Sequence, residues 1–138
     1  MGNHGREKLG VWVALIVFGA LATLQLHGME RWAALSQIES GDNDKAVGAA
    51  GEISRYQIKP EVWRRYTKPD ADWQDPQDSL AVAREIMQER CADFEATFHR
   101  APTDREFYIL WNAPARIQSP SKAVTARAER FCNLVALR

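Results

Sequence analysis

The sequence has little of several features that mark specialised classes of protein. Lysine and arginine together number 18, and so do aspartate and glutamate, so the formal net charge is zero. Without a basic field, we expect no binding to nucleic acid. The three histidines, His4, His27 and His99, lack metal-ligand spacing, so we expect neither a metal nor another cofactor. The chain of 138 residues has no internal repeat and no low-complexity tract, which indicates one domain at most.

Cysteine is also scarce, with Cys91 and Cys132 the two in the chain. In an oxidising compartment they could bridge two helices that are far apart in the sequence, and a loop of this length would make the bond worth roughly 4 kcal/mol. The alternative is a pair of buried free thiols that pack as small hydrophobic groups. We predict the disulfide, because the N-terminal sequence indicates export.

Residues 1–26 have the composition of an export signal. Arg6 and Lys8 precede an apolar run over residues 9–26, and Ala20-Leu21-Ala22 forms a small-x-small cleavage site. An uncleaved membrane anchor is the alternative, because the run is also just long enough to span a bilayer. No cysteine ends the run, which argues against a lipoprotein. In either case we expect residues 27–138 to be exported, to the periplasm or beyond the cell.

The remainder of the chain is predicted to be mainly helical. A hydrophobic content of 46% and five tryptophans favour a folded globule. A first helix over about residues 29–40 ends before Gly41, and residues 41–58 form a glycine-rich loop with at most a small β-ribbon at 52–58. Later helix starts are indicated by Pro60, by Asp75-Pro76, by a capping box at Thr103–Glu106, and by Ser119-Pro120.

Glu39 is the most informative residue. At 100° per residue it falls on the same helical stripe as Trp32 and Leu35, so we expect its carboxyl group to point inward. Desolvation and the negative end of the helix dipole both favour the protonated form of such a group. A protonated carboxyl group can donate a proton near neutral pH. The alternative is a solvated glutamate before a glycine C-cap.

A series of short motifs begins at Glu39. In chain order they are Glu39-Ser40, Asn43, Ala46-Val47, Ala50-Gly51, Gln57-Ile58, Asp75-Pro76 and Asn112-Ala113. In this order and spacing they resemble the soluble lytic transglycosylase branch of the lysozyme-like superfamily. The resemblance covers roughly residues 32–134. It implies that residues 27–138 form a lysozyme-like α+β domain, with helices around a substrate groove.

The resemblance also implies a chemistry. Such enzymes cleave the β-1,4 bond between N-acetylmuramic acid and N-acetylglucosamine in peptidoglycan strands, and Glu39 would act first as the acid and then as the base. The muramyl 6-hydroxyl attacks the anomeric carbon and gives a 1,6-anhydro product, so no second carboxylate is required, unlike in most glycosidases. Glu52, Asp42 and Asp44 are candidate partners for a hydrolytic muramidase instead. We predict that they form turns and are solvated.

Five further residues are implied as the substrate-binding set. They are Ser40, Tyr56, Gln57, Trp111 and Asn112. The side chains of Gln57 and Asn112 would contact N-acetyl groups or orient Glu39, and the alternative is that they satisfy buried backbone groups. Ser40 would form hydrogen bonds near the acid, and the Trp111 ring could stack on a sugar.

The chain departs from the family pattern at four positions. Ser54 replaces a glycine, Tyr56 a methionine, and Pro114 the glycine after Asn-Ala. Trp111 replaces the tyrosine whose phenol usually forms a hydrogen bond with the catalytic acid. We predict that Tyr56 supplies this hydroxyl instead. The alternatives are a degenerate site that binds glycan without cleaving it, and a small membrane-tethered structural protein.

Overall fold

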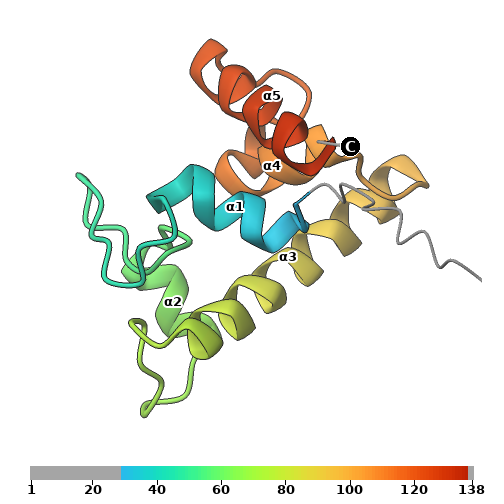
Figure 1. Ribbon diagram of the computed structural model, residues 1–138. Coiled ribbons are helices and arrows are strands. Elements are labelled where there is room, and N and C mark those ends of the chain that lie inside the picture. Colours follow the sequence, from blue (N-terminus) through green and yellow to red (C-terminus); the bar gives the residue numbers. More distant parts are fainter. Residues whose placement is uncertain (1–28, 137–138) are drawn as a thin grey trace, which may run out of the picture.

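The computed structural model describes residues 29–136, and within this range the chain forms five α-helices, one short 3₁₀ helix and no β-strand. The central helix α1 (Arg31–Ser40) has α4 (Asp104–Asn112) and α5 (Lys122–Ala136) on one side (Figure 1). On its other side lie α2 (Pro60–Tyr66) and the long α3 (Pro76–Phe98). The prediction of a mainly helical domain is confirmed.

The predicted signal or anchor, residues 1–26, lies outside the described part of the chain. Among residues 29–136, no helix is both long enough and apolar enough to cross a membrane.

Two of the predicted helix starts are formed by side-chain caps. The Asp75 carboxylate accepts hydrogen bonds from the backbone N–H groups of Gln77 and Asp78 at the start of α3. At the start of α4, Thr103 and Glu106 form the reciprocal capping box. Both were readable from the sequence because a cap involves residues only two or three positions apart.

The start of the last helix was predicted too early. The backbone N–H of Ser119 donates to the carbonyl oxygen of Arg116 (3.0 Å), which closes a turn after the 3₁₀ helix η1 (Pro114–Arg116). Helix α5 begins at Lys122, where the Ser121 hydroxyl accepts a hydrogen bond from the backbone N–H of Val124 (3.3 Å).

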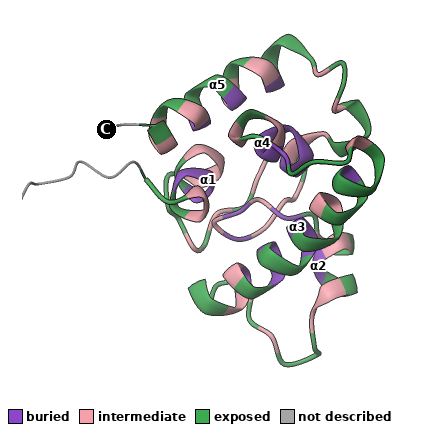
Figure 2. Cartoon of the chain, turned by 90° about the vertical axis from the view of Figure 1, so that its right-hand side faces the viewer, coloured by how far each residue is buried: buried purple, intermediate pink, exposed green. Residues whose placement is uncertain are grey.

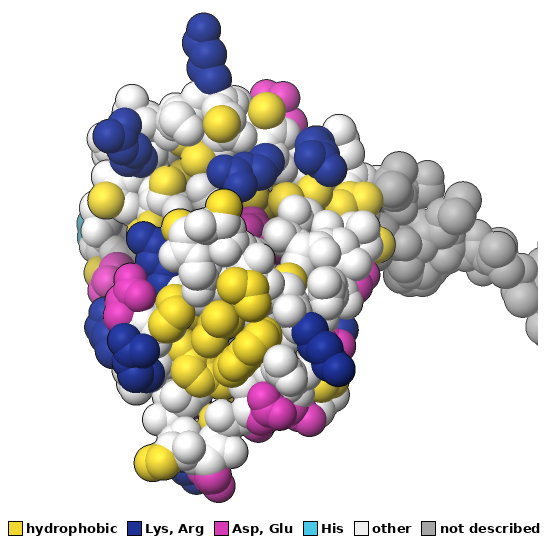
Figure 3. All heavy atoms as spheres, turned by 90° about the vertical axis from the view of Figure 1, so that its left-hand side faces the viewer, with side chains coloured by type: hydrophobic (Ala, Val, Ile, Leu, Met, Phe, Trp, Pro, Cys, Tyr) yellow, Lys and Arg dark blue, Asp and Glu magenta, His cyan; other side chains and the backbone are white. Residues whose placement is uncertain are grey.

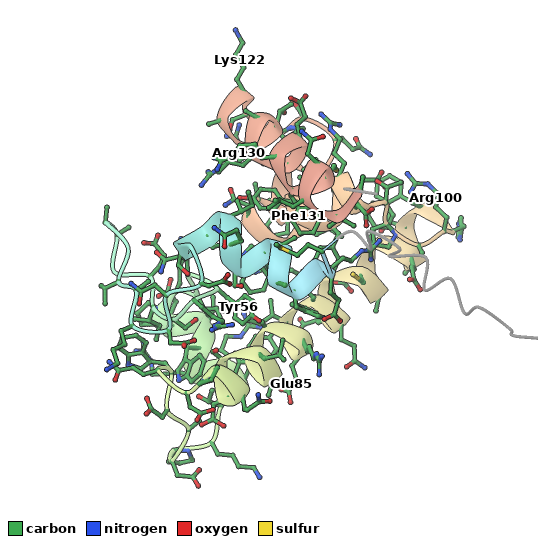
Figure 4. All side chains as sticks on the ribbon, viewed as in Figure 1. Tyr56, Glu85, Arg100, Lys122, Arg130 and Phe131 are labelled. Carbon is green, nitrogen blue, oxygen red and sulfur yellow. The ribbon has the colours of Figure 1, made fainter. Side chains whose placement is uncertain are left out.

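The core is centred on α4, in which the five consecutive residues 107–111 are buried (Figure 2). Such a run requires contacts on all sides of the helix rather than along one stripe. Phe131 of α5 is fully buried, and its ring stacks on Phe107 at 5.9 Å and lies 5.5 Å from Tyr108. Its side chain points from α5 towards α4 (Figure 4). This packing fixes the position of Tyr108 relative to α1 and α5.

The glycine-rich loop is held by backbone hydrogen bonds rather than by strands. Gly41 ends α1 in the left-handed conformation (φ 65°), and its N–H donates to the carbonyl oxygen of Gln37. The predicted β-ribbon is reduced to isolated bridges, in which Ile53 pairs with Val47 and with Ile58. The N–H groups of Ile53 and Ile58 each donate to the other residue's carbonyl oxygen at 2.8 Å, so residues 54–57 form a tight turn.

The predicted disulfide is absent. Cys91 on α3 and Cys132 on α5 are half-buried free thiols, and burial raises the pKa of both. Helix α1 passes between α3 and α5 (Figure 1), and Arg31 of α1 pairs with Asp104 of α4 at 2.7 Å. The Cys91 thiol is close to the charge of Arg31, and the Cys132 thiol to that of Asp104. Both thiols pack against the hydrophobic core as small hydrophobic groups on separate helices, which is the alternative to the disulfide.

Candidate active site

A cavity of about 670 Å³ opens where the C-terminal end of α1 and the 41–58 loop meet the other helices. Sites for small ligands commonly have volumes of about 300–1,000 Å³, so the cavity is large enough for part of a glycan. Its lining is formed by Glu39, Gly48, Ala49, Glu52, Gln57, Ile58, Lys59, Glu61, Val62, Ile86, Arg90, Trp111, Asn112, Pro114 and Arg127.

Glu39 lies in this cavity, on the last turn of α1. Burial raises the pKa of its carboxyl group, and the nearby charge of Glu52 acts in the same direction. A hydrogen bond from Tyr108 and the positive charge of Arg127 lower the pKa, but the net shift is upward. Leu35, one turn earlier, is fully buried, as the stripe pattern predicts. The expectation that Glu39 is held towards its protonated form is confirmed.

The hydrogen-bond partner of Glu39 is Tyr108, not Tyr56 as predicted. The Tyr108 hydroxyl donates to Oε1 of Glu39 at 2.6 Å. Tyr108 has no exposed surface, and burial, followed by the charge of Glu39, raises the pKa of its phenol, so it remains a neutral donor. Oε2 of Glu39 has no hydrogen-bond partner within residues 29–136. The second oxygen is therefore the one that can pass a proton to a ligand.

Tyr56 lies in the core instead. Its side chain is 2% exposed and packs edge-on against Trp32 (6.2 Å) and Trp111 (6.3 Å). It lies beneath α1 in Figure 4 and does not line the cavity. The prediction that Tyr56 supplies the hydroxyl to Glu39 is wrong, and the buried position of Tyr56 outside the cavity lining does not support a role in substrate binding. A sequence signal did exist for Tyr108, which lies four positions before Asn112 and so on the same face of α4.

Gln57, Trp111 and Asn112 line the cavity with Glu39, whereas Ser40 does not. The Ser40 hydroxyl donates to the carbonyl oxygen of Arg55 (2.8 Å) and accepts from the backbone N–H of Asn43 (3.1 Å). Ser40 therefore ties the end of α1 to both parts of the loop. This agrees with a hydrogen-bonding role near the acid, but not with direct contact to a ligand in the cavity.

Gln57 is held in an unusual backbone conformation. Its φ is 52°, in the left-handed region that most residues avoid, and its side-chain Nε2 donates to the carbonyl oxygen of Ser54 at 3.0 Å. Ser54, where the family pattern has glycine, also has a left-handed φ of 69°. Conformations of this kind cost energy and persist where the surrounding structure imposes them, often at functional sites. Here they place the Gln57 amide in the cavity.

The three other candidate acids have different environments. The Asp44 carboxylate pairs with Arg55 at 2.5 Å, and the Asp42 carboxylate accepts a hydrogen bond from the Ser36 hydroxyl. Both stabilise the loop and lie outside the cavity lining. Glu52 lines the cavity, although its Oε2 also accepts a hydrogen bond from the backbone N–H of Ala50 (3.1 Å). Glu52 is thus the candidate partner that shares the cavity with Glu39.

Arg90 is a structural member of the site that the sequence did not reveal. One of its guanidinium nitrogens donates to the carbonyl oxygens of Leu110 (2.8 Å) and Trp111 (2.6 Å) at the end of α4. These carbonyl groups lie in the last turn of the helix, where intrahelical partners are missing. Arg90 therefore fixes the end of α4 that carries Trp111 and Asn112.

Comparisons with family models, curated proteins and solved structures found no match for this chain. Within residues 29–136, no three His, Cys, Asp or Glu side chains are grouped so that they could hold a metal ion.

Proposed function

We propose that the protein is a peptidoglycan lytic transglycosylase with a lysozyme-like fold, and that Glu39 is its acid and base. The observation that carries this proposal is the Glu39–Tyr108 hydrogen bond inside a cavity that also holds Gln57 and Asn112. A carboxyl group with a raised pKa, one oxygen fixed by a buried phenol and the other without a protein partner, suits a proton donor.

The proposed reaction begins with proton transfer from Oε2 of Glu39 to the glycosidic oxygen. The bond between this oxygen and the anomeric carbon of the muramyl residue then breaks, and the muramyl 6-hydroxyl forms a new bond to that carbon. The Glu39 carboxylate takes up the hydroxyl proton, which restores the acid. The Tyr108 hydroxyl stabilises the transient carboxylate, because hydrogen bonds to charged groups are stronger than those to neutral ones.

The side chains around Glu39 suit a glycan substrate. The amides of Gln57 and Asn112 each provide both a donor and an acceptor, which matches the N-acetyl groups of the sugars. Trp111 adds an aromatic wall, although its ring is mostly covered by the core. The proposal includes export of the protein, because peptidoglycan lies outside the cytoplasmic membrane. Residues 1–26 would then be cleaved as a signal, or residues 9–26 would remain as a membrane anchor.

A hydrolytic muramidase is the second candidate, and the presence of Glu52 in the cavity favours it. In this alternative Glu52 would activate a water molecule that attacks the anomeric carbon, as the second carboxylate of an inverting glycosidase does. The hydrogen bond from Ala50 to Glu52, which stabilises the loop turn, weighs for the lytic reaction.

The test is mass spectrometry of the soluble products that the purified full chain releases from peptidoglycan. The lytic reaction predicts 1,6-anhydro products that disappear in Glu39→Gln and persist in Glu52→Gln. The matched control is Glu85→Gln, which makes the same change at an exposed position on α3 (Figure 4). Products with reducing ends that disappear in both Glu39→Gln and Glu52→Gln would identify the hydrolase. Retained binding with no product would identify a non-catalytic glycan-binding module.

A further inference from the structure

Arg127 places a half-buried positive charge in the cavity wall. It lies on α5, next to the fully buried Ala128, and lines the cavity together with residues of the 41–58 loop. Its charge acts on Glu39, so the two side chains lie within electrostatic range of one another. Within residues 29–136, Arg127 forms neither an ion pair nor a side-chain hydrogen bond.

The other basic side chains of the cavity differ from Arg127. Arg90 is already bonded to the carbonyl oxygens of Leu110 and Trp111. Lys59 is exposed at the rim, close in sequence to the equally exposed Glu61. Arg127 is thus the half-buried cation of the described cavity whose hydrogen-bond donors have no protein acceptor.

None of the acids that line the cavity forms an ion pair with Arg127 among residues 29–136. Burial holds Glu39 towards its neutral form, Glu52 accepts a hydrogen bond from the loop backbone, and Glu61 is exposed. A guanidinium group with free donors can bind a carboxylate through two parallel hydrogen bonds, which is the geometry that distinguishes arginine from lysine. More generally, basic side chains stand along the upper part of the face in Figure 3, at the level of α5, where an anionic ligand would be attracted.

We propose that Arg127 binds a carboxylate group of the glycan, so that the site prefers muramic-acid-containing strands to neutral N-acetylglucosamine polymers. This inference rests on the proposed function, and it adds a specificity-determining residue to it. Muramic acid differs from glucosamine by a lactyl ether that bears a carboxyl group. The carboxylate can come from the lactyl group of a peptide-free strand, or from the stem peptide where the lactyl group is amidated.

The test measures binding without cleavage, by titration calorimetry of the full chain carrying Glu39→Gln. Three tetrasaccharides serve as probes: a peptide-free muramyl glycan, the same glycan with stem peptides, and neutral chitotetraose. Arg127→Gln is added to this background, and Lys122→Gln is the matched control. The Lys122→Gln substitution removes one positive charge from the same helix, and the Lys122 side chain projects away from the molecule at the tip of α5 (Figure 4).

We expect Arg127→Gln to weaken binding of a carboxylate-bearing probe roughly 10- to 100-fold, the range for hydrogen bonds to a charged group. Binding of chitotetraose should be unchanged, as should all binding by Lys122→Gln. A loss confined to the peptide-free probe identifies the lactyl carboxylate, and a loss confined to the peptide-bearing probe identifies a stem carboxylate. Three results would overturn the inference: Arg127→Gln weakens binding of all three probes equally, Arg127→Gln weakens binding of none of them, or the Glu39→Gln protein that retains Arg127 binds no probe.

The outcome is separable from that of the proposed function. If the parent chain releases no cleavage product but its preference for carboxylate-bearing probes is lost in Arg127→Gln, the chemistry is refuted and the recognition role stands. If products are released and the preference does not depend on Arg127, only the recognition role fails.

Discussion

Gly48 offers a way to change the cavity without changing the fold. A Cβ atom added at Gly48 would lie 2.5 Å from Oε1 of Gln57 and still closer to Oε2 of Glu52. Both atoms are the ends of flexible side chains that can rotate away, and the third contact, 3.3 Å to Cβ of Glu52, requires a shift of a few tenths of an ångström. Gly51, three residues later, is the matched position: an added Cβ there would meet nothing within 4 Å, but its φ of +83° is unfavourable for any residue with a side chain.

We therefore expect Gly48→Ala to lower activity with little change in stability, and Gly51→Ala to lower stability with little change in activity. Gly48→Ala removes the hydrogen bond from Ala50 to Glu52, worth about 0.5–1.5 kcal/mol, and restricts the unfolded chain, which returns about 0.4–1 kcal/mol. Its free energy of unfolding should change by less than about 1 kcal/mol. Gly51→Ala should cost about 1–2 kcal/mol, because it forces alanine into a left-handed conformation.

Gly48→Ala, the more stable of the two variants, should be the less active one. In Gly48→Ala, Gln57 and Glu52 leave their positions in the cavity, so release of soluble products from peptidoglycan should fall at least tenfold. In Gly51→Ala no cavity side chain is displaced, and the product yield should match that of the parent at temperatures where both are folded. Urea denaturation measures the stabilities, and mass spectrometry with an internal standard measures the products.

One pattern of results would refute the reasoning. If Gly48→Ala were the less stable variant and retained full activity, neither the relief of the crowding by side-chain rotation nor the role of Gln57 and Glu52 in the site would hold. Loss of activity in both variants with an unchanged stability of Gly51→Ala would also refute it, because the backbone strain assigned to Gly51 would then be absent.

Three further substitutions test the site and its support. Tyr108→Phe should lower kcat roughly 10- to 100-fold. It should also move the alkaline limb of the pH profile of kcat/KM to higher pH, because the Tyr108 hydrogen bond lowers the pKa of Glu39 and its removal raises that pKa; an unmoved limb would contradict the contact between Tyr108 and Glu39. Glu39→Gln should abolish turnover yet raise the thermal stability at neutral pH. The Glu39 pKa is higher in the folded state, so its contribution to stability is present below the unfolded pKa and is lost as the pH rises through the folded pKa; equal melting temperatures for parent and variant at neutral pH would argue against burial of the charge. Thr103→Ala should lower the free energy of unfolding by about 1 kcal/mol, measured by urea denaturation, because α4 loses its capping box, and Thr97→Ala, on an exposed turn of α3, is a control that should cost less.

Local features of the fold could be predicted because their causes are local. The caps at Asp75 and Thr103 involve contacts within three residues, so the starts of α3 and α4 followed from the sequence. The start of α5 did not, because the turn from Arg116 to Ser119 competes with the helix signal at Ser119-Pro120. The disulfide was also not predictable from cysteine counts, because bonding requires the two Cα atoms to lie about 4.4–6.8 Å apart.

In the candidate site, too, the locally determined features could be predicted and the contacts between distant segments could not. Periodicity placed Glu39 on the buried stripe of α1, and the structure raises the pKa of its carboxyl group by burial. Periodicity could not pair Glu39 with Tyr108, because 69 residues separate them and only the packing of α1 against α4 brings them together. The family resemblance suggested Tyr56 for a position that this residue, packed between Trp32 and Trp111, does not reach.

The sequence by itself determined where most helices begin, that the domain is mainly helical, and that Glu39 faces inward. These properties depend on hydrogen bonds within a few residues and on the 3.6-residue period of the helix. The tertiary structure decided which phenol contacts the acid, which carboxylate shares its cavity, and which arginine is left without a partner there. Those outcomes depend on distances between segments that are remote in the chain, and only the packed core sets these distances.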